Sequence, residues 1–135
     1  MPALVLDASV TATWFLEDEA DAKGIREKTL AEGAVVPANW PLEIANVLLV
    51  NERRGRITAR ARSTAFDILN AFPIELDGET VAHAWDATCD LAVAHRLTIY
   101  DAAYLELAQR RGLPLASLDR ALRTGATAAG IALLP

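Results

Sequence analysis

Short apolar runs alternate with helix-like stretches along the whole chain, and this order constrains the fold more than any other feature. Strands are predicted over residues 3–7, 35–36, 74–76, 115–118 and 131–134. Helices are predicted over about 8–16, 19–31, 41–54, 58–71, 80–95 and 101–111, with a short one ending near Thr124. This alternation is typical of an α/β fold, in which a parallel sheet carries helices on both faces.

The size and composition of the chain fit one compact domain. Its 135 residues, 53% of them apolar, are close to the commonest domain length, so 1–135 is predicted to be a single domain. No apolar run approaches the roughly 20 residues of a membrane span, and the first residues lack the basic region of a signal peptide. We therefore expect a cytoplasmic protein. The lone Cys89 excludes an internal disulfide, and its helical spacing from Val81 and Trp85 predicts a buried structural thiol.

Four acidic residues stand where an apolar run meets a predicted helix. Asp7 follows Ala-Leu-Val-Leu, Glu43 lies in Trp-Pro-Leu-Glu, Asp101 follows Leu-Thr-Ile-Tyr, and Asp119 follows Leu-Ala-Ser-Leu. In an open parallel sheet such junctions can lie along one edge, and ligands bind outside the carboxyl ends of the strands. Carboxylates that converge there can hold a divalent cation. The set therefore predicts a metal-dependent hydrolase of phosphate esters.

Each acid also has a purely structural interpretation. Asp7, Asp101 and Asp119 each stand at the start of a predicted helix, where aspartate is a favoured N-cap. Glu43 falls in the first turn of its helix, where the helix dipole favours negative charge. Apolar residues surround Glu43 on all sides, however, which predicts a buried helix. Asn46 lies three positions on, on the same face, and a buried carboxylate needs a partner or a metal.

Four segments carry a resemblance to a known family. They are Leu-Val-Leu-Asp7-Ala-Ser9, Pro41-Leu-Glu43-Ile-Ala-Asn46-Val-Leu, Asp101-Ala-Ala-Tyr104-Leu-Glu-Leu-Ala and Leu-Ala-Ser117-Leu-Asp119. In this order the chain resembles the PIN-domain family, and specifically the VapC-type toxins of bacterial toxin–antitoxin pairs, over essentially its whole length. The resemblance implies a three-layer α/β/α fold with a central parallel sheet of about five strands.

The same resemblance implies an activity and a site. It implies a Mg²⁺- or Mn²⁺-dependent endoribonuclease whose metal is held by Asp7, Glu43, Asp101 and Asp119. Hydrogen-bonding support is expected from Ser9, Asn46 and Ser117, although the family more often has Thr where this chain has Ser117. Both ions prefer oxygen ligands, and a bound ion can activate water for attack on phosphorus, so no histidine base is required.

The charge distribution offers further candidates. A net charge of −5 and a pI of about 5.0 argue against indiscriminate binding to nucleic acid, but metal ions would offset site carboxylates in a nuclease. Acidic residues crowd into 17–21, and Glu106 is expected to be exposed to solvent. Within the basic block 53–62, phosphate contacts or a solvated face are both open for Arg53, Arg54 and Arg56.

Two aromatic residues near the start are candidates for contacts with a partner. Trp14 and Phe15 can stack on a base, or belong to the core or to an interface. The resemblance implies a homodimer that is neutralised by a small VapB-type antitoxin. Exposed apolar side chains at 14–16 are the candidates for part of that surface.

Three other functions compete. A phosphoacceptor receiver domain has a similar length and acids beside a metal, but it needs a lysine near the end of the chain, and the only lysines here are Lys23 and Lys28. A haloacid-dehalogenase-type phosphatase needs a second Asp where this chain has Ser9. A non-catalytic interaction module with the PIN fold is the third alternative, and the presence of all four acids weighs against it.

Overall fold

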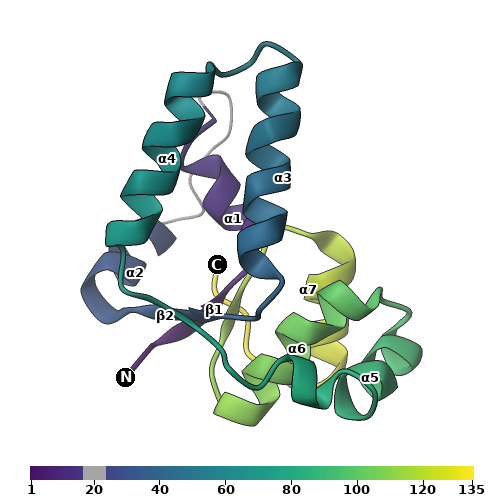
Figure 1. Ribbon diagram of the computed structural model, residues 1–135. Helices are drawn as coiled ribbons and strands as arrows, with labels where there is room; N and C mark the ends of the chain where they lie inside the picture. The colour runs from purple at the N-terminus through teal and green to yellow at the C-terminus, as the bar shows by residue number, and fades with distance from the viewer. Residues whose placement is uncertain (17–23) are drawn as a thin grey trace.

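The computed structural model describes residues 1–16 and 24–135. Within them, four strands form a parallel sheet in the order β3-β2-β1-β4 (Figure 1). They are β1 (Leu4–Leu6), β2 (Ala34–Val36), β3 (Ile74–Leu76) and β4 (Leu115–Ala116). The residues of β1, β2 and β4 are all buried, as expected for a parallel sheet covered on both faces, whereas β3 is an exposed edge strand.

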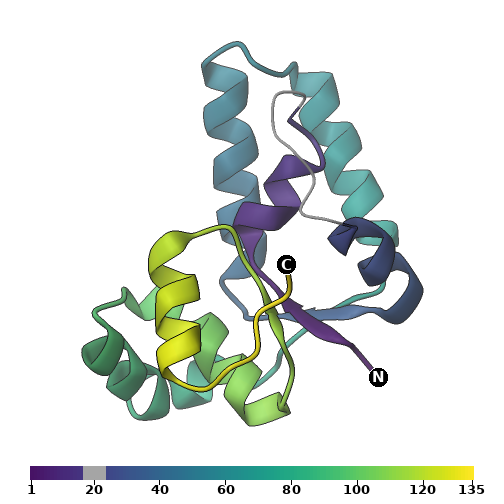
Figure 2. The same cartoon turned by 180° about the vertical axis from the view of Figure 1, so that it is seen from behind.

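Helices cover both faces of this sheet, so the predicted three-layer α/β/α fold is confirmed. They are α1 (Ala8–Thr13), α2 (Ile25–Glu32), α3 (Trp40–Arg53), α4 (Ala59–Ala71), α5 (Ala87–His95), α6 (Ile99–Arg111) and α7 (Arg120–Ala128), with a 3₁₀ turn η1 (Val81–His83). Helices α3 and α4 rise together as a hairpin, while α5, α6 and α7 group on the opposite side (Figures 1 and 2). No helix in the described parts of the chain is long and apolar enough to cross a membrane.

The strand order explains where a site can form. The first two crossovers, from β1 to β2 and from β2 to β3, run in one direction, and the third returns to place β4 beside β1. Parallel crossovers are right-handed, so α1 to α4 lie on one face and α5 and α6 on the other. Helix α6 packs against β1 and β4. The order therefore reverses between β1 and β4, and ligands bind in α/β sheets at such a switch point.

The predicted fifth strand, over residues 131–134, is not present as a strand of the sheet. Residues 131–134 meet the sheet only through an isolated bridge between Leu115 and Leu133. Two backbone hydrogen bonds flank this bridge, from Leu115 N to Ala132 O at 2.9 Å and from Leu134 N to Leu115 O at 2.9 Å. Because β4 has only two residues, it offers too short a ladder for another strand. The sheet thus has four strands rather than about five.

Helix boundaries follow the predictions where a cap is present in the sequence. Thr58 caps α4 by accepting a hydrogen bond from Ala61 N at 3.0 Å, and α6 ends at Gly112 in the left-handed conformation with φ of 64°. The helix predicted over 8–16 ends at Thr13, and the helix predicted over 19–31 begins, among described residues, at Ile25.

The helix predicted over 80–95 is wrong as one element. The chain instead forms η1 and then α5, because Asp86 leaves the helical conformation and its carboxylate accepts a hydrogen bond from Ala87 N at 2.6 Å. Val81 and Trp85 are 78% and 99% exposed, so they do not form a buried stripe, and Cys89 is only half-buried. Helix α3 is likewise buried on one face only, since Leu42 is 74% exposed.

Candidate active site at the carboxyl edge of the sheet

The four predicted acids come from four different segments at one edge of the sheet. Asp7 directly follows β1, and Asp119 follows β4 at the N-cap of α7. Glu43 lies in the first turn of α3, which follows β2, and Asp101 lies in the first turn of α6. Two of these segments flank the switch point between β1 and β4, where a ligand site is expected.

The Asp7 carboxylate is held by two hydroxyl groups. Asp7 is 4% exposed, and its side chain makes no cap hydrogen bond to α1. Its Oδ2 instead accepts hydrogen bonds from Ser9 Oγ at 2.6 Å and from Ser117 Oγ at 2.7 Å. The structural interpretation of Asp7 as an N-cap therefore fails, and the two serines predicted to support the acids both contact it.

Backbone donors orient these hydroxyls. Ser9 Oγ accepts from Leu118 N at 3.0 Å, and Ser117 Oγ accepts from Asp119 N at 3.1 Å. With their lone pairs engaged by backbone N–H groups, both hydroxyls direct their protons to Asp7. Asp119 is tied to the same network through its backbone, and its own carboxylate caps α7 through Leu122 N at 3.3 Å. For Asp119 the cap interpretation therefore holds beside its place in the cluster.

Glu43 is held by two residues from different helices. Tyr104 of α6 donates its hydroxyl to Glu43 Oε1 at 3.3 Å, and the Asn39 side-chain amide donates to Glu43 Oε2. The same amide donates to Tyr100 O at 3.3 Å. Asn46, predicted as a partner of Glu43, is exposed instead, and within the described residues it makes no hydrogen bond to it.

Sequence reasoning missed Asn39 as a partner of Glu43, although a signal was present. Asn39 stands at the N-cap of α3, four positions before Glu43, and a helix brings such positions to one face. Its side chain makes no cap hydrogen bond to the backbone. The amide is thus used for Glu43 and for the backbone of Tyr100.

Asp101 is not a cap either. Helix α6 begins two residues earlier than predicted, at Ile99, with Thr98 as its N-cap. Thr98 Oγ1 accepts a hydrogen bond from Asp101 N at 3.1 Å. Because the cap is already made by Thr98, the half-exposed Asp101 carboxylate remains available for a ligand.

Electrostatics show that the four acids act on one another. Burial, and then repulsion from the neighbouring Asp7 and Asp101, raises the pKa of Glu43 to about 7. Hydrogen bonds from Asn39 and Tyr104 lower the pKa but do not cancel this rise. Burial also raises the pKa of Asp7 and that of Asp101, and Asp119 raises both further by repulsion. These carboxylates are therefore close enough to disfavour one another's charge, as expected of a site that is completed by a cation.

The donor set fits a hard divalent cation, although the side chains do not form a closed cage. Within residues 1–16 and 24–135, no three His, Cys, Asp or Glu side chains are placed so that they form a metal-binding group. Asp7 and Glu43 point oxygens at hydroxyl and amide donors. Mg²⁺ usually takes only one or two carboxylates and keeps several waters, so these oxygen donors suit Mg²⁺ or Mn²⁺ without a complete protein shell.

Comparisons with known proteins agree with this geometry. The family model described as "PIN domain" matches residues 4–126. The chain belongs to the PIN-domain family. It is also 32% identical over 119 residues to Ribonuclease VapC3 of Pyrobaculum aerophilum, a match that covers 88% of this chain and 91% of that protein. The recognition of a VapC-type PIN domain is thereby confirmed, and the receiver and dehalogenase alternatives are wrong.

Solved structures give the same result for the fold. PAE2754 from P. aerophilum is 26% identical, with a TM-score of 0.69 over 92% of this chain and 79% of that chain. FitAcB from Neisseria gonorrhoeae has a TM-score of 0.64 at 14% identity, covering 98% and 96% of the two chains. VapC20 from Mycobacterium tuberculosis, described as a sarcin-ricin-loop-cleaving toxin, has a TM-score of 0.61 at 17% identity, covering 98% of each.

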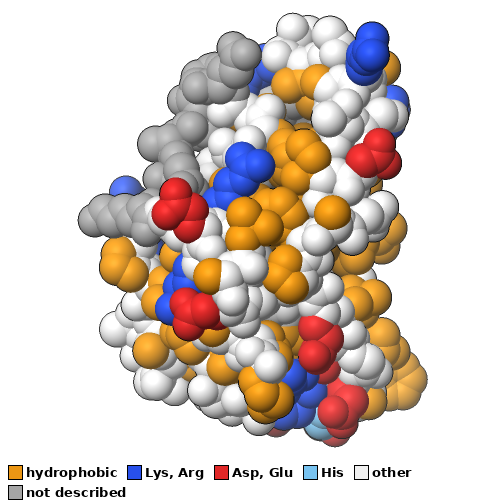
Figure 3. All heavy atoms as spheres, turned by 90° about the vertical axis from the view of Figure 1, so that its left-hand side faces the viewer, with side chains coloured by type: hydrophobic (Ala, Val, Ile, Leu, Met, Phe, Trp, Pro, Cys, Tyr) orange, Lys and Arg blue, Asp and Glu red, His pale blue; other side chains and the backbone are white. Residues whose placement is uncertain are grey.

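A groove of about 420 Å³ extends from Asp119, one of the four acids of this PIN domain, to Arg56 of the basic block. Ser9, Thr13 and Asp119 line one part of it, and Asn51 and Arg56 line another. Arg56 Nη1 donates to Asn51 Oδ1 at 2.8 Å. Arg53 and Arg54 are exposed near the tip of the α3–α4 hairpin, and basic side chains lie near the upper end of the face in Figure 3.

Of the alternatives open for Trp14 and Phe15, the structure agrees with packing against the core. Trp14 stacks on Phe72 with ring centroids 5.4 Å apart, and Trp14 and Phe15 both pack against the core. Leu16 is buried. The prediction of an exposed apolar surface at 14–16 is therefore wrong for these side chains, and the acidic run at 17–21 lies outside the described residues.

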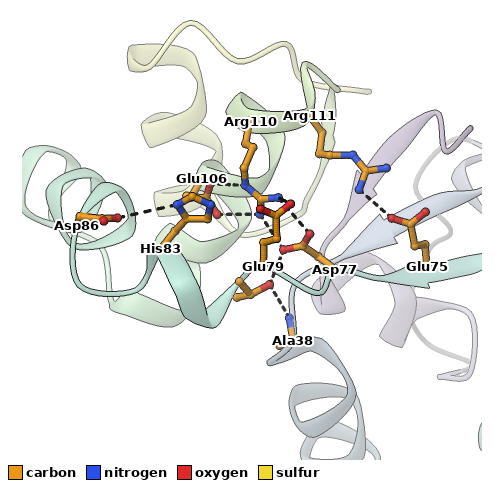
Figure 4. Close-up of polar contacts among 10 residues, drawn as sticks. Ala38, Glu75, Asp77, Glu79, His83, Asp86, Glu106, Arg110 and Arg111 are labelled. Atoms are coloured by element: carbon orange, nitrogen blue, oxygen red, sulfur yellow. Dashed lines mark hydrogen bonds and ion pairs between the residues drawn. The ribbon is translucent and has the colours of Figure 1, made fainter.

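A second group of acids, which we call the Arg110 cluster, surrounds one guanidinium (Figure 4). Arg110 bonds Asp77 through Nη2 to Oδ2 at 2.7 Å and Glu106 through Nε to Oε2 at 2.7 Å. Arg110 Nη1 also lies 3.4 Å from Glu79 Oε2. Asp77 and Glu106 are 5% and 4% exposed, so the prediction of a solvated Glu106 is wrong. Glu106 faces Arg110, which stands four residues further along α6. This spacing, visible in the sequence, allows such a pair.

Proposed function

We propose that this PIN domain is a Mg²⁺- or Mn²⁺-dependent endoribonuclease, the toxin of a toxin–antitoxin pair. The observation that carries the proposal is that acids from four segments lie at one edge of the sheet, with Ser117 bonding both the Asp7 carboxylate and the backbone of Asp119. Burial first, and repulsion between the acids second, raises the pKa of Asp7, Glu43 and Asp101. Ribonuclease VapC3, which is 32% identical, supports RNA as the substrate. The family supports a divalent cation, and the donor chemistry fits one.

Asp7 and Asp101 are proposed as the main ligands of the cation, with Glu43 and Asp119 beside them. A bound Mg²⁺ or Mn²⁺ would supply activation of water and stabilisation of the leaving oxygen. Ser9 and Ser117 fix one oxygen of Asp7 by two short hydrogen bonds, which leaves its Oδ1 for the cation or its waters. The buried Tyr104 hydroxyl stays protonated, because burial and the nearby Asp7 and Glu43 hold its pKa well above the ordinary value.

Glu43 couples the site to pH. Burial is the main cause that raises the pKa of Glu43 to about 7, so about half of the Glu43 side chains are protonated at neutral pH when no cation is bound. A cation that neutralises the cluster favours the carboxylate, so binding releases this proton. We expect the affinity for Mn²⁺ to rise as the pH rises through about 7.

RNA is proposed to enter along the groove that joins the acids to the basic block. Arg56 lines this groove together with Asp119, and Arg53 and Arg54 lie exposed near it. Guanidinium groups suit phosphate contacts. A cognate VapB-type antitoxin is proposed to cover the same groove in the cytoplasm, and growth arrest by the expressed chain should be relieved by co-expressing the antitoxin.

The decisive test compares wild-type protein with Asp7→Asn. The wild type should cleave structured RNA with Mg²⁺ or Mn²⁺ and lose the activity in EDTA, whereas Asp7→Asn should lose at least a hundredfold in rate with its fold intact. Asp90→Asn, which changes an exposed acid on α5, is the matched control and should cleave like wild type. Equal activity of Asp7→Asn and wild type would refute the assignment. A folded wild type that cleaves no RNA would favour the non-catalytic alternative.

A second copy of the chain is proposed to pack on the apolar surface formed by the start of α3, η1 and the start of α6. Leu42, Val81 and Tyr100 are exposed there and line an apolar cavity of about 280 Å³. The fully exposed Trp85 lies one residue beyond Ala84 in the same lining. Two-fold pairing needs one patch that carries both a protrusion and a recess. Light scattering should find a dimer for wild type and a monomer for Trp85→Glu; unchanged mass would refute this interface.

A further inference from the structure

A chain of hydrogen bonds leads from the Arg110 cluster to the start of α3. Asp77 lies just after β3, and its backbone N–H donates to Val36 O at 2.9 Å, which places it beside the end of β2. Thr80 donates its hydroxyl to Asp77 Oδ2 at 2.8 Å. The same Thr80 oxygen accepts a hydrogen bond from Ala38 N at 3.0 Å (Figure 4). The loop between β2 and α3 is thus held by one buried hydroxyl.

The residue after Ala38 touches the candidate site. Asn39 donates from its side-chain amide to Glu43 Oε2 and to the backbone oxygen of Tyr100. Fixing the backbone of Ala38 therefore fixes the position from which Asn39 reaches Glu43. The order of contacts is Asp77 to Thr80, Thr80 to Ala38, and then through the chain to Asn39 and Glu43.

The cluster also anchors the other helix of the site. Arg110 is near the end of α6, and this helix carries Asp101 and Tyr104 near its beginning. The bond from Arg110 to Asp77 joins α6 to the end of β3, and the bond from Thr80 to Ala38 joins the same point to α3. The helices that carry Glu43 and Asp101, α3 and α6, are therefore both tied to one buried carboxylate, that of Asp77.

We propose that Thr80 is a positioning residue, which holds the start of α3 so that Asn39 presents Glu43 to the divalent cation. This rests on the proposed function in that it assumes a cation at the four acids. Thr80 does not touch the acids itself. Its hydroxyl is suited to the role because it is buried and both donates and accepts, and loss of either bond would free the backbone of Ala38.

The test replaces Thr80 with valine, which keeps the shape of the side chain and removes the hydroxyl, and with serine, which keeps the hydroxyl. Thr29→Val is the matched control, since Thr29 is also buried, at 0% exposed against 9% for Thr80, and its hydroxyl donates to Ile25 O at 2.8 Å within α2. Mn²⁺ affinity is measured by calorimetry, and hydrogen exchange of the Ala38 amide reports the bond directly.

The expected result is at least a tenfold loss of Mn²⁺ affinity and faster Ala38 exchange in Thr80→Val, with wild-type values in Thr80→Ser and Thr29→Val. RNA cleavage by Thr80→Val should recover when Mn²⁺ is raised, which a merely structural defect would not produce. Should the valine variant not fold, Thr80→Cys, whose thiol bonds weakly, repeats the comparison.

Two outcomes separate this inference from the proposed function. If Thr80→Val folds and binds Mn²⁺ like wild type, the positioning role is overturned while the ribonuclease assignment stands. If wild type binds Mn²⁺ but cleaves no RNA, the ribonuclease assignment fails, and the Mn²⁺ affinities still decide the role of Thr80. A wild type that binds no Mn²⁺ overturns both.

Discussion

Among the described residues, two groups of buried or half-buried carboxylates behave in opposite ways. In the Arg110 cluster, one guanidinium bonds two buried acids, and the pKa of Asp77 is lowered despite its burial by hydrogen bonds from Arg110 and Thr80. At the switch point, Asp7, Glu43 and Asp101 all have raised pKa values. Within residues 1–16 and 24–135, no Lys or Arg forms an ion pair with these acids or with Asp119.

The difference between the groups lies in their counter-charge, since both are built from the same residue types. A buried carboxylate with a fixed cation stabilises one arrangement of the chain. A group without one is held in place at a cost to the fold, and the proposed cation would remove that cost. The first group therefore has the character of a structural tie, and the second that of a binding site.

The largest effect is expected from removing the counter-charge of the first group. Arg110→Met leaves Asp77 and Glu106 buried and unneutralised, so we expect the free energy of unfolding to fall by about 3–5 kcal/mol, as measured by urea denaturation. Adding Asp77→Asn and Glu106→Gln should restore much of the loss, because no unpaired charge remains. A loss below about 1 kcal/mol for Arg110→Met would mean that the cluster acts as a surface ion pair.

The second group should instead gain stability from an added cation. At a hundred times its dissociation constant, Mn²⁺ should stabilise the fold by about 2.7 kcal/mol, seen as a rise in Tm. Asp101→Asn should abolish most of this rise. Arg62→Gln, which breaks the ion pair between Arg62 of α4 and Glu52 of α3, should lower the Tm of the metal-free protein but leave the Mn²⁺-induced rise unchanged. An equal Mn²⁺ shift in Asp101→Asn and wild type would contradict a cation site at these acids.

The groups should also differ in their pH dependence. The pKa of Glu43 in the fold is about 7, above its ordinary value of 4.5, so its contribution to metal-free stability is present below about pH 4.5 and is lost as the pH rises through 7. The lowered pKa of Asp77 has the opposite sign, with stability lost only on acidification below 3.8. Glu43→Gln should therefore raise the free energy of unfolding of the metal-free protein at pH 8. The gain should be only about 1 kcal/mol, because Glu43 is partly exposed and solvent screens its charge. If the Tm values of wild type and Glu43→Gln changed in parallel between pH 5 and 8, this prediction would be contradicted.

The smallest effect is expected at Asp119, which belongs to the site and also caps α7. Asp119→Ala should cost roughly 1 kcal/mol of stability through the lost cap, while Asp119→Asn should keep the cap. Both should reduce RNA cleavage to a similar degree, because neither retains the carboxylate. Cleavage at the wild-type rate by Asp119→Asn would limit the role of Asp119 to capping.

Much of this architecture was predictable because its signals are local. The buried runs of β1, β2 and β4, the Thr58 cap and the Gly112 terminus each depend on neighbouring residues. The break at Asp86 was not predictable from apolar spacing, because a cap inside an apolar pattern competes with the helix. The prediction of a fifth strand was wrong because pairing of residues 131–134 depends on the length of β4, which has only two residues and forms one bridge, from Leu115 to Leu133.

The four acids of the candidate site, and the two serines that bond Asp7, were predicted from their positions and the family resemblance, but the Asn39 partner of Glu43 and the burial of Glu106 were not. Asn39 was missed although it stands four positions before Glu43, because the spacing does not show that its amide also bonds the start of α6, 61 positions away at Tyr100. Glu106 was misplaced although Arg110 stands four positions further along α6, because the same spacing also occurs on solvated helix faces, and the contact of Arg110 with Asp77, 33 positions away, is not visible in it. Partners of this kind are fixed by tertiary contacts, which spacing in one sequence does not contain.

The pairing of the first strand with the last has a consequence for how the molecule comes into being. Val5 pairs with Leu115, and Asp7 takes a hydrogen bond from Ser117, 110 positions later. A chain growing from its amino end cannot make this junction until synthesis has passed Ser117. Any chemistry that depends on the junction is therefore withheld from nascent chains shorter than this, and a cell that makes the protein is not exposed to it before that point of synthesis.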